Sequence, residues 1–232
     1  MASTLTTTGP IRFADRREAG RRLAERLAKF RRLNPVVIGV APSAMPIAAE
    51  IAEALDAPLD TVAVASLAIG ATRADHVGTT AEGGIAFFDA ARAERIDAEP
   101  EAVDAALIDA QQRVEQRTAS WHRGERRRSL SRRNVLLVAE VLDDDQVAAA
   151  AACAVRDRGA AQVTYVAAKV RLAAAIAAAD WMDEIVCLET VGHAIAACDF
   201  LERCTPVTDE EVRSLLDENA RARRLSRETG PH

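Results

Sequence analysis

The sequence predicts an α/β fold: a central, mostly parallel sheet flanked by helices. Short apolar runs alternate along the chain with segments that have helical spacing. Parallel neighbours need crossover connections, which are usually helices, and strands buried on both faces are almost continuously apolar. The length of 232 residues suits one large domain or two small ones, and we expect a single domain covering 1–232.

The first part of the chain alternates helices and strands. Residues 15–30 place apolar side chains on one stripe at helical spacing, with Asp15 as the N-cap. Residues 36–40 form an apolar run between two prolines, which predicts a buried strand. Helical spacing returns at 43–56, and 59–65 predicts the next strand.

Residues 66–100 are the least regular part of the chain, because four glycines interrupt the pattern. Within this region, 85–88 predicts a short strand after a turn. We expect the region to form a small hood or lid together with the C-terminal segment. Further helices are expected at 101–120, 144–158, 171–179 and 208–224, and further strands at 134–139, 162–168 and 184–188.

Composition excludes several classes of protein. Hydrophobic residues make up 49% and charged residues 28% of the chain, which argues against wholesale disorder. The net charge of -5 argues against a surface that binds nucleic acid or acidic lipid over its whole extent. We find no apolar run long enough to span a bilayer and no secretory signal, so we expect a cytoplasmic protein with no membrane partner.

The cysteines give no sign of a disulfide framework or a metal site. The four cysteines lack CxxC spacing and are sparse for a disulfide-stabilised scaffold. We therefore expect buried, reduced thiols at all four positions.

Five stretches of sequence together resemble a type I phosphoribosyltransferase, of the kind common in bacteria. They are FADRREAGRRLAERLAKF, VVIGV with PIAAEIAEALDAPLDTVAV, AIGAT with AEGGI, NVLLV, and DEIVCLET with TDEEVRSLL. Their order and spacing carry the resemblance. It covers roughly 12–216, which we take as the core, and a basic tail follows at 217–232. The resemblance implies a glycosyltransferase that uses phosphoribosyl pyrophosphate.

The family places its chemistry at three strand ends, and the first two are altered here. A turn that usually carries Arg and Gly, and holds pyrophosphate with its backbone N–H groups, reads Ala41, Pro42, Ser43, Ala44. Pro42 has no N–H, and no glycine allows close approach of the backbone. The basic pair expected after the next strand is replaced by Ala65 and Ser66.

The third feature is two acidic residues followed by a loop of Gly, Ala and Thr that opens a helix. The resemblance implies that the acids hold the ribose hydroxyls and that the loop holds the 5′-phosphate. Here Glu140 remains, its neighbour is Ala139, and the loop has become Asp143, Asp144 and Asp145. A carboxylate about 4 Å from a phosphate repels it by roughly 4 kcal/mol at an effective dielectric of 20. A helix N-terminus attracts a phosphate by about 0.3–1 kcal/mol, or by up to about 2 kcal/mol when partly buried. The repulsion from one aspartate therefore cancels this attraction.

Three interpretations of these acidic residues remain open. The aspartates can cap the following helix and occupy the anion site internally. Glu140, Asp143 and Asp144 can instead hold a divalent cation, because hard oxygen ligands suit Mg²⁺ or Ca²⁺. The third interpretation is an altered nucleotide or sugar site in which Glu140 still contacts a ribose hydroxyl.

An arginine-rich segment, 122–133, precedes the apolar run at 134–139. Its central residues Arg126, Arg127 and Arg128 form a candidate patch for phosphate or nucleic acid. A solvated loop is the competing interpretation.

Three functional hypotheses follow. The first is a catalytically inactive member of the family that serves as a binding, regulatory or assembly module, expected to form a homodimer or to bind another protein, with no cofactor. The second is an active phosphoribosyltransferase or a sugar-phosphate-handling enzyme with a rebuilt site, which would use Mg²⁺. The third is a nucleic-acid-binding regulator that acts through Arg123–Arg133.

Overall fold

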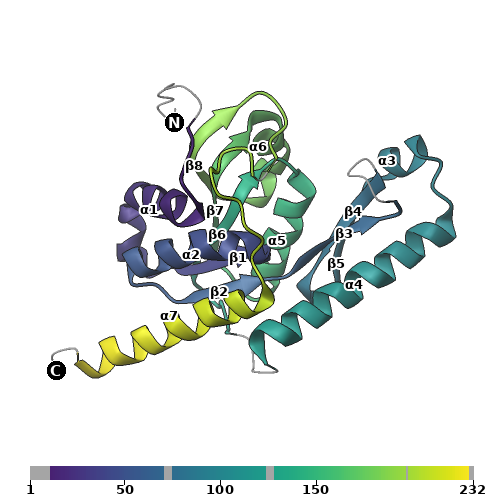
Figure 1. The fold of residues 1–232 in the computed structure, drawn as a ribbon. Coiled ribbons are helices and arrows are strands. Elements are labelled where there is room, and N and C mark those ends of the chain that lie inside the picture. The colour runs from purple at the N-terminus through teal and green to yellow at the C-terminus, as the bar shows by residue number, and fades with distance from the viewer. Residues whose placement is uncertain (1–10, 71–74, 124–127, 197, 230–232) are drawn as a thin grey trace.

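The computed structural model describes residues 11–70, 75–123, 128–196 and 198–229 (Figure 1). Its centre is a five-stranded sheet in the order β2-β1-β6-β7-β8, and every neighbouring pair is parallel. This confirms the predicted fold class. The strands are β1 (Val36–Val40), β2 (Leu59–Val62), β6 (Asn134–Leu142), β7 (Gln162–Arg171) and β8 (Glu184–Val191).

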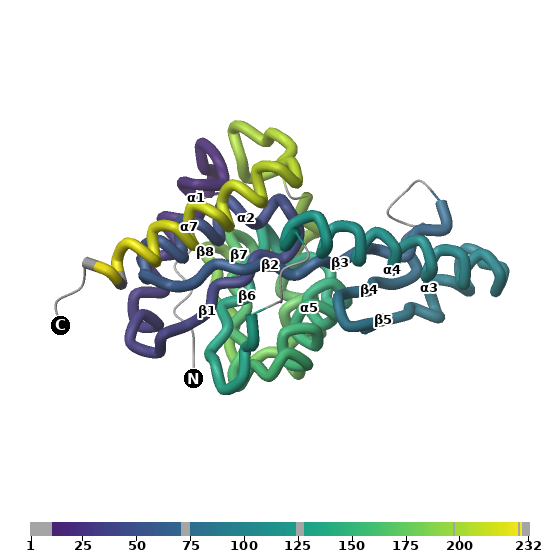
Figure 2. Tube along the Cα trace, turned by 90° about the horizontal axis from the view of Figure 1, so that it is seen from below, coloured from purple at the N-terminus to yellow at the C-terminus, as the bar shows by residue number. Residues whose placement is uncertain are grey.

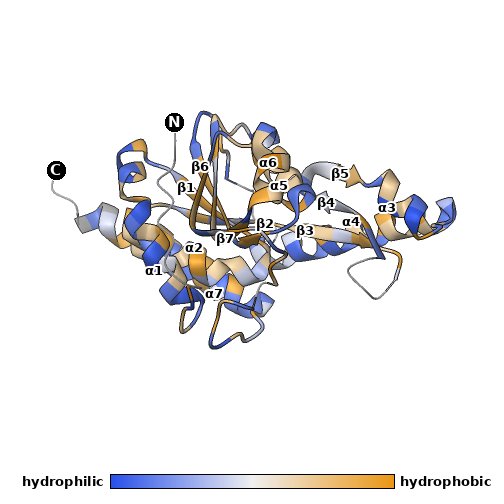
Figure 3. Ribbon diagram, turned by 90° about the horizontal axis from the view of Figure 1, so that it is seen from above, coloured by the Kyte–Doolittle hydropathy of each residue, from blue (hydrophilic) through white to orange (hydrophobic). Residues whose placement is uncertain are grey.

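Helices cover both faces of this sheet. On one face, α1 and α2 pack on alternate strand residues such as Val37 and Leu136, and α7 packs on α2. On the other face, the alanines of α5 pack on Ile38 and Leu137. Apolar residues accordingly gather on the strands, and polar residues on the outer helix surfaces (Figure 3). The helices are α1 (Arg16–Arg26), α2 (Ala41–Leu55), α5 (Asp145–Asp157), α6 (Leu172–Ala178) and α7 (Asp209–Thr229).

The hood is more regular than the sequence predicted. An antiparallel sheet in the order β3-β4-β5 is followed by α3 (Ala90–Arg95) and the long helix α4 (Pro100–His122). This unit projects from the side of the five-stranded sheet (Figure 1, Figure 2). Its strands are β3 (Val64–Ala68), β4 (His76–Ala81) and β5 (Ile85–Phe88).

The single strand predicted at 59–65 is wrong, because the chain leaves the parallel sheet at Ala63. The Ala63 N–H donates to the Glu82 carboxylate at 2.8 Å, and its carbonyl accepts from the Glu82 N–H at 3.2 Å. These two contacts turn the chain from β2 into β3. The turn predicted before 85–88 is confirmed, since Gly83 and Gly84 adopt positive φ values of 82° and 76°.

Three strands extend three residues beyond the predicted ends, to Leu142, Arg171 and Val191. Polar residues interrupt the apolar pattern there, but a charged side chain in each of the three extended segments is neutralised by an ion pair. Glu140 pairs with Arg16, and Lys169 of β7 pairs with Glu189 of β8 at 2.9 Å.

The C-terminal region differs from expectation in three ways. Residues 217–229 continue helix α7 rather than forming a separate tail. This helix packs against α2 and α4, so it is not part of a lid over the sheet. Cys198 and Cys204 form a disulfide, because a tight loop brings their Cα atoms to 5.6 Å; Cys153 and Cys187 are free and half-buried.

Among the described residues, no helix has the length and apolarity needed to cross a bilayer.

Gly20 of α1 lies against the backbone of α2. A Cβ atom there would lie 2.8 Å from the Ile47 carbonyl oxygen and 2.9 Å from Glu50 Cβ. We expect Gly20→Val to lower the free energy of unfolding by about 1–3 kcal/mol, because the two helices must separate. Chemical denaturation measures this loss. Gly192→Val is the control, since nothing lies within 4 Å of a Cβ at Gly192, and equal losses would contradict the packing argument.

Candidate functional site

The candidate site lies at the carboxyl edge of the five-stranded sheet. The chain places β2 on one side of β1 and β6 on the other, so the strand order reverses between β1 and β6. Ligands of open parallel sheets bind at such a reversal, outside the carboxyl ends of the strands. Helix α2 begins directly after β1, and two residues separate the end of β6 from the start of α5.

Glu140 is the central acidic residue of this edge, and it is paired inside the protein. It is only 5% exposed, and Arg16 Nε donates to its Oε1 at 2.6 Å. The Ser43 hydroxyl also donates a hydrogen bond to this carboxylate. Burial raises the pKa of Glu140, and this effect outweighs the opposite effects of Ser43 and Arg16.

Arg16 connects Glu140 to the segment after β8. Its Nη1 donates to the carbonyl oxygen of Thr205 at 2.6 Å, and its Nη2 contacts the Cys204 sulfur at 3.4 Å. The guanidinium is therefore held from two sides, and the residue is itself only 7% exposed. A pair fixed in this way orients the Glu140 carboxylate toward α1 rather than toward a ligand.

Asp143 is also used internally, but it does not cap α5. Its side chain is buried and accepts from Arg171 Nε at 2.8 Å and from the Ile195 N–H at 3.1 Å. Asp143 thus ties the end of β6 to the end of β7 and to the loop that follows β8.

Asp144 is the residue that caps α5. It accepts hydrogen bonds from the N–H groups of Gln146 at 3.0 Å and Val147 at 3.4 Å, and Asp145 is the first residue of the helix. The capping interpretation therefore holds for Asp144, whereas Asp143 accepts from Arg171 and Ile195 instead. Across the described ranges, no group of three or more His, Cys, Asp or Glu side chains is arranged to hold a metal ion. A cation held by Glu140, Asp143 and Asp144 stays a prediction.

Pro42, Ser43 and Ala44 lie within the first turn of α2 rather than in a loop. Ala41, which joins β1 to this helix, has a φ of 66°, in the left-handed region that usually favours glycine. The turn expected to hold pyrophosphate is therefore replaced by a direct strand-to-helix junction.

The arginine-rich segment is only partly described. Arg126 and Arg127 lie outside the described residues. Arg128 is exposed, and its carbonyl oxygen accepts from Arg158 Nη2 at 3.0 Å. The phosphate or nucleic-acid patch at these positions stays a prediction.

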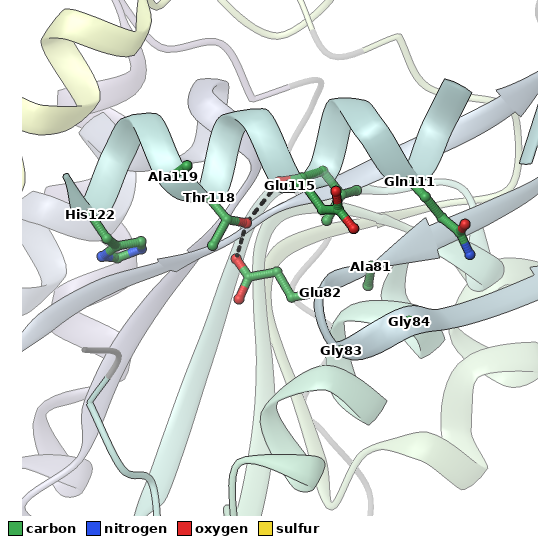
Figure 4. A pocket seen from close by; sticks show the side chains of 10 residues that line it. Ala81, Glu82, Gly83, Gly84, Gln111, Glu115, Thr118, Ala119 and His122 are labelled. Carbon is green, nitrogen blue, oxygen red and sulfur yellow. Dashed lines mark hydrogen bonds between the residues drawn. The ribbon is translucent and has the colours of Figure 1, made fainter. Parts of the chain in front are cut away.

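A cavity of about 640 Å³ lies between the turn at Glu82–Gly84 and α4 (Figure 4). The Glu82 carboxylate accepts from Thr118 Oγ1 at 3.2 Å on its wall. Glu82 and Glu115 both line the cavity, so it disfavours anions. No motif in the sequence signalled it, because its walls come from a turn and from one face of α4.

The fold is that of an α/β protein of the phosphoribosyltransferase class, and the comparisons agree. Two curated proteins of Mycobacterium tuberculosis, from strains H37Rv and CDC 1551, are 33% identical over 211 residues; the first is named "Putative phosphoribosyl transferase Rv0571c". Each alignment covers 88% of this chain and 46% of the relative, so the chain spans about half the length of these relatives. No family model matches.

A solved structure supports the same fold. The protein TT1426 from Thermus thermophilus is 25% identical with a TM-score of 0.71, over 90% of this chain and 99% of that chain. These findings support membership of the type I phosphoribosyltransferase family.

Arg16→Met should destabilise the protein in a pH-dependent way. The variant leaves a buried carboxylate unpaired, which costs about 3–5 kcal/mol of unfolding free energy near neutral pH. The pKa of Glu140, already raised in the folded state above its ordinary value of 4.5, rises further without Arg16. The loss should therefore shrink as the pH falls toward 4.5, where Glu140 is protonated, and grow as the pH rises.

Urea denaturation at several pH values measures this dependence. Arg17→Met is the control, because Arg17 pairs with Glu50 on the surface and should cost about 1 kcal/mol or less. A loss for Arg16→Met that is small and constant with pH would contradict the role given to the Arg16–Glu140 pair.

Proposed function

We propose that this chain is a phosphoribosyltransferase-fold protein that does not transfer phosphoribosyl groups and that serves as a binding, regulatory or assembly module. One observation carries the proposal. The acidic residue that would hold the ribose is already paired with Arg16, and the helix end that would hold the phosphate is already capped by Asp144. Internal groups occupy both positions.

A ribose diol needs a carboxylate that accepts its hydroxyl protons. Glu140 already accepts from Arg16 and Ser43, and it is almost completely buried. Separating it from Arg16 would leave a buried charge, at a cost of about 3–5 kcal/mol. Two hydrogen bonds from sugar hydroxyls to the carboxylate contribute about 1.5–3 kcal/mol each, so they would be largely cancelled by that cost and would leave little net affinity.

A 5′-phosphate meets a similar obstacle at α5. The N–H groups of Gln146 and Val147 already donate to Asp144. A phosphate at this helix end would have to displace a carboxylate and would then face its charge. The repulsion of about 4 kcal/mol exceeds the attraction of the helix end.

The second candidate is an active enzyme with a rebuilt site. The contact between Ser43 and Glu140 favours it, because it brings a hydroxyl and a carboxylate together at the strand edge where the family's chemistry occurs. In this alternative Mg²⁺ would accompany the donor. The curated relatives carry the name of a phosphoribosyl transferase, which is consistent with this candidate.

For the assembly role we propose a homodimer that acts in the cytoplasm. Leu172 and Ile176 of α6 support the assembly role, since they are exposed by 54% and 69% one helical turn apart. Apolar side chains in such a position favour association with a second surface.

Calorimetry with phosphoribosyl pyrophosphate tests the inactive assignment. Purified chain should give no magnesium-dependent heat of binding, and no pyrophosphate should be released with a panel of purine and pyrimidine bases. Magnesium-dependent binding that disappears in Glu140→Gln would support the active candidate and overturn the proposal. Arg17→Gln is the control for loss of a surface charge.

A further inference from the structure

The disulfide between Cys198 and Cys204 closes a short loop after β8, and this loop packs on the beginning of the chain. The Phe13 N–H donates to the Phe200 carbonyl oxygen at 2.9 Å, and the Phe13 carbonyl oxygen accepts from the Glu202 N–H at 2.9 Å. The rings of Phe13 and Phe200 are buried and meet edge to face, with their centroids 6.1 Å apart. Loop 198–205 and the residues before α1 therefore form one packed unit.

The two cysteines of this disulfide lie in different surroundings. Cys198 is exposed, whereas Cys204 is half-buried. Arg16 Nη2 lies 3.4 Å from Cys204 Sγ, and Nη1 of the same guanidinium donates to the Thr205 carbonyl oxygen at 2.6 Å. One cysteine is thus open to solvent, and the other has a fixed cation beside its sulfur.

This difference determines where the disulfide reacts with a thiol. The rate of thiol–disulfide exchange depends on access to the attacked sulfur and on the stability of the thiolate that leaves. Attack at Cys198 meets an exposed residue and releases Cys204 as a thiolate beside Arg16, and a neighbouring arginine stabilises a thiolate. Attack at Cys204 would have to reach a half-buried residue. Both factors favour Cys198.

We propose that Cys198 is a redox modification site at which a small thiol of the glutathione class opens this disulfide. The small molecule's thiolate forms a bond to Cys198 Sγ, and the bond between the two cysteines breaks with its electron pair on Cys204 Sγ. A second small thiolate then attacks the small molecule's sulfur in this mixed disulfide and releases the Cys198 thiolate. Two small thiols thus become one small disulfide, their two protons go to solvent or to the cysteines, and the cysteine pair gains two electrons. The small disulfide closes the loop by the reverse steps.

Opening the disulfide affects the central sheet through Arg16. Glu140 accepts from Nε of this guanidinium, and the Cys204 sulfur contacts its Nη2. A thiolate at Cys204 therefore competes with Glu140 for one cation, and the loop that packs on Phe13 loses its covalent closure. Exposed disulfides are typically the labile or regulatory ones.

This inference goes beyond the proposed function and does not depend on it. It uses only the disulfide and the contacts of Arg16, and its tests involve no phosphoribosyl pyrophosphate. Failure of the redox site would therefore leave the inactive assignment standing, and the reverse also holds.

Incubation of the full chain with reduced glutathione, without denaturant, tests the site. Rapid alkylation followed by peptide mass spectrometry should find glutathione on Cys198 and the alkyl group on Cys204 early in the reaction. The proposal is overturned if the disulfide opens only in denaturant, or if glutathione appears on Cys204 as much as on Cys198.

The rate of opening tests the role of Arg16. Glu140→Gln should speed opening about threefold or more, because the guanidinium loses a negative partner and stabilises the leaving thiolate more strongly. Glu50→Gln is the matched control, since it removes a carboxylate that pairs with Arg17 and Arg21 on the surface. Equal rates for the two variants would overturn the part given to Arg16.

Amide hydrogen exchange of the oxidised and reduced chain tests the link to the beginning of the chain. The amides of Phe13 and Glu202 should exchange faster after reduction, because their hydrogen bonds join the loop to that segment. The amides of β4 in the hood are the control and should keep their rates. Faster exchange in β4 as well, or no change at Phe13, would contradict a local device.

Discussion

The ion pair between Arg16 and Glu140 joins the beginning of the chain to the centre of the sheet. Arg16 comes from the first residue of α1, and Glu140 lies 124 positions later in β6. The same guanidinium holds the backbone at Thr205, so one side chain connects α1, the central strand and the segment after β8. Because both partners are almost completely buried, neither can leave the other without exposing an unpaired charge to a medium that solvates it poorly. The carboxylate is therefore a structural element of this protein.

Three acidic side chains at the carboxyl edge of the sheet are used in contacts within the protein. Glu140, Asp143 and Asp144 all satisfy internal donors, which leaves the edge itself without a free acceptor among these three residues. The cations that the strand ends lack are found on α4, where Arg113 and Arg117 face the space between the hood and the sheet. A binding role and the absence of transfer chemistry are compatible in this arrangement.

The parallel sheet was predictable because its strands are short, nearly continuous apolar runs between helical segments. The strand at 36–40 was predicted with both ends correct. The hood was not predictable, because its strands are short, and the change from β2 to β3 depends on Glu82, which lies far along the chain from Ala63. Glu140 and the aspartates could be identified from the sequence as the altered site. Their partners Arg16 and Arg171 could not, since pairing across 124 and 28 positions leaves no local signal. No pattern in the sequence distinguished Arg113 and Arg117 either, because two arginines on a surface helix are common.

A crystal structure of the chain soaked with phosphoribosyl pyrophosphate and Mg²⁺ would show whether the Arg16–Glu140 pair and the Asp144 cap persist in the presence of the donor. We expect Arg16 Nε to stay within hydrogen-bond distance of Glu140, Asp144 still to cap α5, and no ribose diol to lie on β6. A ribose held by Glu140, with the Arg16 guanidinium displaced and a phosphate at the first turn of α5, would contradict this expectation.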